Sequence, residues 1–137
     1  MQISPYLNFA GNCGEAFRFY HQVLGGKLDV MTFGDSPMAG DVPPDWQDRV
    51  IHCALMIDGQ LLMASDSPPE QFEPASGTWV TLGVQSTDEA ERIWAALSEG
   101  GQVVMPLEKT FWSPAFGMVK DRFGTPWMIS THPPAHC

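Results

Sequence analysis

The feature that most constrains the fold is a structural phrase that the chain contains twice. The stretch "EAFRFYHQVLGGKL" (residues 15–28) places apolar residues at helical spacing, stops at two glycines and resumes as an extended segment. The stretch "EAERIWAALSEGGQVV" (residues 89–104) has the same form. Glu15 precedes Glu89 by 74 residues and Gly25 precedes Gly100 by 75. This spacing predicts a tandem duplication.

Each copy is predicted to form a strand, a helix and three further strands. In the first copy, Asp58-Gly59 between two apolar runs is a strong hairpin signal. The predicted strands cover residues 3–9, 28–33, 49–57, 60–66, 78–84, 102–107, 115–121 and 125–131. Residues 34–48 are too rich in Gly, Pro and Asp to be anything but loop.

These elements predict an α+β fold of tandem βαβββ modules. A four-stranded sheet with a helix on one face leaves its other face bare, so we expect two copies to form a curved mixed sheet with an internal cleft. We expect one domain over residues 1–137, with repeats at about residues 3–66 and 78–131. A proline-rich linker, residues 67–77, joins them.

Composition excludes several classes of function. The formal net charge of -9 argues against nucleic acid or an anionic membrane as the main partner. No stretch approaches the roughly 20 apolar residues that span a bilayer, and the N-terminus lacks a signal peptide's pattern. Cys13, Cys53 and Cys137 fit neither a disulfide framework nor a zinc motif. The expected location is therefore the cytoplasm.

Alternation along residues 50–57 predicts which side chains face the cleft. The more apolar set should pack under the helix: Ile51, Cys53, Leu55 and Ile57. The other set should face the cleft: Val50, His52, Ala54 and Met56. His52 is thus the one histidine on a predicted strand that points inward.

Several phrases resemble a known superfamily. The helix phrase "EAFRFYHQVLGG" and the closing "FGMVKDRFGTPWMI" resemble the vicinal oxygen chelate superfamily, which includes glyoxalases, bleomycin-resistance proteins and extradiol dioxygenases. "PYLNFAGNCGEAFRFY", "IHCALMIDG" and "MASD" are similar to its PhnB-like branch. The resemblance covers about residues 3–131 and implies a homodimer. Some PhnB-like proteins are named demethylubiquinone methyltransferases, but this chain is too short and wrongly ordered for a typical S-adenosylmethionine domain.

The resemblance also implies where a metal would bind. Metal-dependent members use His and Glu on the first strand of each half and on late strands. The matching positions here are Ser4 or Pro5, Trp79, Met128 and residues 62–64. None of these holds a divalent ion as glyoxalases do, so no metal and no cofactor is expected.

The candidate ligand-binding residues are His52, Trp112, Phe116 and Met128. His52 is either a structural histidine or a site residue, and Asp66 is either its partner or a turn former. Trp112 and Phe116 form either a ligand wall or a core or dimer contact. The tail with His132, His136 and Cys137 is interpreted as a frayed terminus rather than a metal site.

Three functions remain open. The first is a protein that binds a small molecule in its cleft without the usual metal. The alternative is an uncharacterised enzyme of the superfamily, with His52 as a base or with an unfamiliar metal site. In the third, the cleft is vestigial and the dimer surface carries the function.

Overall fold

The structure is a computed structural model of the chain and describes residues 1–131. Contacts between residues divide the chain into two compact units, Met1–Glu73 and a second unit that begins at Pro74. Each unit is described by itself. The predicted frayed terminus with His132, His136 and Cys137 lies outside the described residues.

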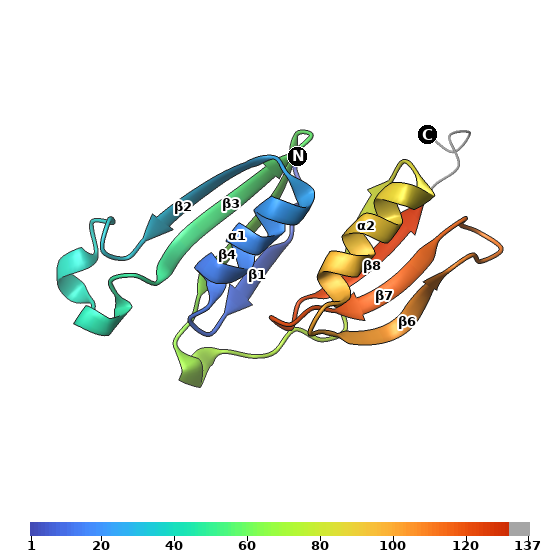
Figure 1. The fold of residues 1–137 in the computed structure, drawn as a ribbon. Coiled ribbons are helices and arrows are strands. Elements are labelled where there is room, and N and C mark those ends of the chain that lie inside the picture. Colours follow the sequence, from blue (N-terminus) through green and yellow to red (C-terminus); the bar gives the residue numbers. More distant parts are fainter. Residues whose placement is uncertain (132–137) are drawn as a thin grey trace. The chain divides into compact units, whose positions relative to one another are not determined.

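The first unit is a four-stranded mixed sheet with one helix on a single face (Figure 1). The sheet order is β1-β4-β3-β2, with β1 parallel to β4 and the other pairs antiparallel. The elements are β1 (Tyr6–Phe9), α1 (Cys13–Leu24), β2 (Lys27–Thr32), β3 (Val50–Ile57) and β4 (Gln60–Asp66). β1 begins at Tyr6 rather than at residue 3, because Pro5 has no N–H to donate to the sheet.

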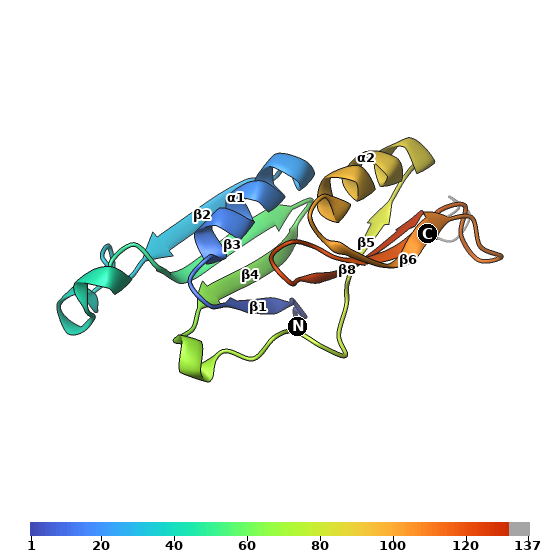
Figure 2. The ribbon, with the colours of Figure 1, turned by 60° about the horizontal axis from the view of Figure 1, so that its bottom comes forward.

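The second unit repeats this topology, with sheet order β5-β8-β7-β6. Its elements are β5 (Val80–Val84), α2 (Thr87–Ser98), β6 (Gln102–Glu108), β7 (Phe116–Lys120) and β8 (Pro126–Thr131). Ser86 is the N-cap of α2, since its hydroxyl accepts a hydrogen bond from the Glu89 N–H at 3.1 Å. In each unit the helix covers one face of its own sheet (Figure 2). The predicted α+β fold of βαβββ modules is confirmed.

The double glycines explain why the same phrase occurs in both units. Gly26 has a φ of 85°, and a side chain there would overlap the carbonyl oxygen of Met56 on β3. Gly101 lacks the positive φ, but its Cβ would likewise overlap the carbonyl oxygen of Lys120 on β7. In each unit, the chain leaving the helix thus passes so close to the strand backbone that only glycine fits.

The core of each unit lies between helix and sheet. In the first unit Phe17 packs edge-on against Phe9, with ring centroids 6.1 Å apart, and Cys53 and Leu55 are fully buried beneath α1. In the second unit Trp127 is fully buried, and its indole N–H donates to the Asp121 carboxylate at 2.9 Å. None of the helices in residues 1–131 is long and apolar enough to cross a membrane.

The predicted face is wrong for Val50. Val50 was expected to point away from the helix, yet only 2% of it is exposed, and it lies beside Gly14 of α1. The pairing of β2 with β3 shifts between Met31 and Thr32, so that Thr32 pairs with Val50. A shift of one residue turns a side chain to the opposite face.

Candidate functional site

The face of the first sheet that α1 does not cover carries the histidine singled out by the sequence. Residues that pair directly across strands share a face, so the register defines this set. We call it the first open face; its members include Tyr6, Asn8, Met31, His52, Ala54, Met56 and Met63. His52 is exposed there, as expected from its alternation with buried Cys53.

His52 is paired with a tyrosine that the sequence analysis missed. The Tyr6 hydroxyl lies 3.3 Å from Nδ1 of His52, and the two rings stack with centroids 5.8 Å apart. Tyr6 reaches across β4 from β1 to do so, and it stays 47% exposed. The bond engages Nδ1, which leaves Nε2 as the ring nitrogen for a ligand. The pair is therefore a fixed polar group on an accessible surface.

Methionine is concentrated on the sheet faces opposite the helices. The second open face, defined by register in the same way, includes Thr81, Met105, Phe116, Met118 and Met128. Together the two open faces hold six of the chain's eight methionines. Met31 is 48% exposed, Met56 39% and Met105 41%. Thioether side chains are flexible and polarisable, so such faces adapt to ligands of varied shape.

The remaining candidate ligand residues lie in the second unit. Phe116 and half-buried Met128 lie on the second open face, where the Thr81 hydroxyl contacts the Met128 sulfur at 3.7 Å. Trp112 precedes β7 and packs edge-on against Phe116, with centroids 5.3 Å apart. Trp112 is 49% exposed, and its neighbour Phe111 is 97% exposed. Phe111, Trp112 and Phe116 thus form an aromatic cluster that is partly accessible.

Asp66 is a structural residue and not the partner of His52. Its carboxylate accepts backbone N–H bonds from Gly11 at 2.9 Å, Cys13 at 3.0 Å and Val50 at 2.9 Å. It is only 6% exposed. These bonds tie the start of α1 and the start of β3 to the end of β4. Because the N–H groups at the start of α1 already bind Asp66, they are not available to a phosphate or carboxylate ligand.

The first unit also contains a close pair of buried thiols. The sulfur atoms of Cys13 and Cys53 lie 3.5 Å apart, and both cysteines are free and fully buried. The hydrogen bond with Cys53, followed by burial, raises the pKa of the Cys13 thiol far above its usual value. A thiol held protonated in this way is neither a nucleophile nor a metal ligand.

The residues present do not fit a metal centre of the glyoxalase kind. Within residues 1–131, no three His, Cys, Asp or Glu side chains gather closely enough to hold an ion. Of the positions where such ligands were expected, Met128 offers only a thioether and Trp79 an indole. Neither suits a divalent cation that prefers imidazole and carboxylate.

Comparisons with known proteins agree with this fold. A family profile described as 3-demethylubiquinone-9 3-methyltransferase matches residues 1–130. Protein YjdN from Escherichia coli (strain K12) is 36% identical over 139 residues, which covers 95% of each protein. Protein PA1353 from Pseudomonas aeruginosa is 50% identical, and its crystal structure matches with a TM-score of 0.88 over 96% of this chain and 98% of that one.

More distant structures show the fold alone. A PhnB protein from Bacillus cereus is 22% identical, with a TM-score of 0.78 over 96% of this chain and 99% of that one. A glyoxalase/bleomycin resistance protein/dioxygenase family enzyme from Burkholderia phytofirmans is 16% identical, with a TM-score of 0.62 over 93% of this chain and 97% of that one. The chain therefore belongs to the family described as 3-demethylubiquinone-9 3-methyltransferase, and it shares its fold with a glyoxalase/bleomycin resistance protein/dioxygenase family enzyme.

Proposed function

We propose that the first open face binds a small molecule with an apolar body and one hydrogen-bonding group. The observation that carries this proposal is the Tyr6–His52 pair, which is exposed among methionines rather than buried in a core. Exposed apolar side chains that gather around a few fixed polar groups are typical of ligand sites. The methionines would surround the apolar body, and Nε2 of His52 would meet the polar group.

The proposed binding needs no metal ion. This part rests on the residues at the expected ligand positions, where Met128 and Trp79 stand in place of carboxylate or imidazole. Elemental analysis of protein purified without chelators or affinity metals tests it. The expected result is far less than one equivalent of Ni, Zn, Fe or Mn per chain. One tightly bound equivalent would refute it.

A thermal-shift screen of small aromatic and aliphatic alcohols, amides and acids tests the binding itself. A ligand present at 100 times its Kd stabilises the protein by roughly 2.7 kcal/mol, which raises Tm measurably. The histidine variant His52→Ala should weaken the best compound about fivefold, the value of one hydrogen bond. The matched control His21→Ala changes an exposed histidine on α1 and should leave affinity unchanged. Equal losses in both variants would contradict the site.

The second candidate function is catalysis with His52 as a general base. The specific observation in its favour is the Tyr6 hydroxyl on Nδ1, because a base whose ring is oriented by a neighbour is a recurring catalytic arrangement. Here His52→Ala would leave ligand affinity nearly intact and abolish turnover. Equal losses of affinity and turnover would show that His52 is a structural residue.

The methyl transfer in the family's description is not part of this proposal. A typical S-adenosylmethionine domain binds its cofactor after a strand of a largely parallel sheet. In the described residues each sheet has one parallel pair, β1 with β4 and β5 with β8. The Gly11 and Cys13 N–H groups at the start of α1 already bind Asp66. These residues do not fit that cofactor.

We further propose that the chain forms a homodimer. The support is β6, an edge strand with Val103 46% and Val104 49% exposed. An exposed apolar edge strand favours association with another chain. Light scattering after size exclusion should give twice the chain mass of 15.1 kDa. The variant Val103→Lys should shift the protein toward monomer, whereas a monomeric wild type would refute the proposal.

A further inference from the structure

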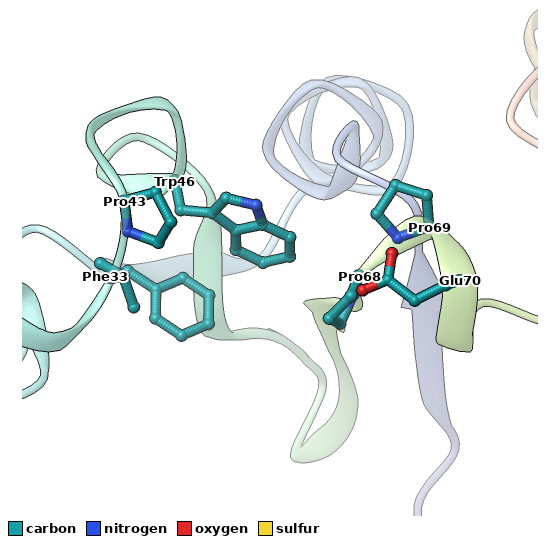
Figure 3. A pocket seen from close by; sticks show the side chains of 7 residues that line it. Phe33, Pro43, Trp46, Pro68, Pro69 and Glu70 are labelled. Carbon is teal, nitrogen blue, oxygen red and sulfur yellow. The ribbon is translucent and has the colours of Figure 1, made fainter.

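The first unit has a pocket that neither Tyr6 nor His52 lines. It lies at the end of the sheet where β2 and β4 finish and β3 begins. The pocket has a volume of about 330 Å³. Its walls come from the loop after β2 and from the segment after β4 (Figure 3): Phe33, Val42, Pro43, Trp46, Pro68, Pro69 and Glu70.

The wall that contains the aromatic residues is held in place by its own hydrogen bonds. Phe33 packs edge-on against Trp46, with centroids 5.4 Å apart and an interplanar angle of 78°. The Phe33 N–H donates to the Arg49 carbonyl at 2.9 Å, and the Gln47 side chain donates to the Ala39 carbonyl at 2.9 Å. The loop is therefore ordered around its aromatic pair before any ligand arrives.

The opposite wall is stiff for another reason. Pro68 and Pro69 have fixed φ angles, and Pro69 begins the short 3-10 turn Pro69–Gln71. Figure 3 shows the Glu70 carboxylate beside the two prolines, across the view from Trp46. Glu70 is the ionisable residue among the seven that line the pocket. An indole ring and a carboxylate thus line the same apolar pocket.

This arrangement favours a positively charged ligand. The face of an indole ring attracts cations, and a carboxylate at the rim of an apolar pocket adds a Coulombic attraction. Arg49 stacks on Trp46, with its guanidinium 4.5 Å from the ring centroid. Arg49 is not among the residues that line the pocket. The net charge of -9 also favours the binding of a cation.

We propose that this pocket binds an organic cation, an ammonium group attached to an aromatic or branched aliphatic body. The body fills the space between Trp46 and the prolines, and the ammonium group contacts the Glu70 carboxylate. The site is independent of the Tyr6–His52 pair, and the proposal does not rest on the function proposed for the first open face.

Three probes with one ring system and different charges test the proposal by calorimetry near neutral pH. They are 1-naphthylmethylammonium, 1-naphthylmethanol and 1-naphthylacetate. The ammonium probe should bind about tenfold more tightly than the acetate, with the alcohol between them. Glu70→Gln should weaken the ammonium probe about fivefold and change the alcohol by less than about twofold. Trp46→Ala should weaken all three probes.

Two control variants locate the effect. Glu73→Gln removes an exposed carboxylate just along the chain and should leave all three affinities unchanged. His52→Ala should also leave them unchanged, which separates this site from the first open face. Circular dichroism melts of each variant show that the fold is retained.

Several outcomes would overturn the proposal. Equal affinities for the three probes, or no binding of the ammonium probe, would refute the claim that the pocket prefers a cation. If Glu70→Gln binds the ammonium probe as tightly as Glu73→Gln does, Glu70 does not contact the ligand. Tighter binding of the acetate would point instead to Arg49, whose buried Nη1 has no hydrogen-bond partner within residues 1–131.

Discussion

Replacing Asp66 tests how the first unit is held together. Oδ1 of its carboxylate accepts from the Gly11 and Cys13 N–H groups, and Oδ2 accepts from the Val50 N–H. Asp66→Ala leaves these three donors unpaired at a site where the wild-type residue is 6% exposed. An unpaired buried donor costs about 1–3 kcal/mol, and water entering the space left by the side chain lowers that cost. The expected loss is therefore about 3–5 kcal/mol of the free energy of unfolding.

The variant Asp66→Asn should have an intermediate effect. Its amide oxygen can still accept from Gly11 and Cys13. Its NH₂ group then faces the Val50 N–H, and two donors cannot form a hydrogen bond with each other. We expect a loss of about 2 kcal/mol, compared with a total stability of roughly 5–15 kcal/mol for a domain. The control Asp48→Asn removes the same charge from an exposed position and should change stability by less than about 0.5 kcal/mol.

Urea unfolding followed by circular dichroism measures these differences. Amide hydrogen exchange locates them, because protection should fall first at Cys13 and Val50 in both Asp66 variants. The reasoning is refuted if Asp66→Ala costs less than about 1 kcal/mol. It is also refuted if the two amides keep wild-type protection in a variant that is destabilised.

Two further predictions follow from the backbone and from the buried thiols. Gly26→Ala should lower the free energy of unfolding, measured in urea, well beyond Gly25→Ala. Both positions have positive φ, but only the Gly26 side chain would overlap the Met56 carbonyl. Equal losses of stability in the two variants would contradict this steric argument. The raised pKa of the Cys13 thiol favours the protonated folded state, so its contribution to stability is complete below pH 9.0, the usual thiol pKa, and is lost as pH rises further. Wild type should lose about 1 kcal/mol from this source between about pH 9 and 10, and Cys13→Ser should not; parallel pH profiles would show that Cys13 is not the source.

Local signals in the sequence predicted most of the fold. Asp58-Gly59 predicted the hairpin between β3 and β4, and both residues have positive φ, at 49° and 80°. Alternation placed Cys53 and Leu55 under the helix and His52 on the other face. These features depend on residues close together in the chain, which is why periodicity and turn chemistry suffice for them.

The parts that sequence reasoning missed depend on distant pairings. The partner of His52 is Tyr6, which lies 46 residues earlier and reaches across an intervening strand. Val50 changed faces because of a register shift, which no local pattern indicates. The lining of the pocket between Trp46 and Glu70 joins two loops that periodicity does not describe. Each of these features depends on contacts between distant segments, so it can be recognised only when the strand pairing is known.

The central claim is that ligand binds the first open face, and methionine methyl NMR tests it most directly. With ¹³C-methyl methionine in the protein, the compound that most raises Tm is titrated in. The account predicts that the Met31, Met56 and Met63 signals shift together, while Met1 and Met38, outside both open faces, stay in place. Stable signals from those three methionines under a saturating, stabilising ligand would contradict it, as would a broad chemical library with no stabilising compound.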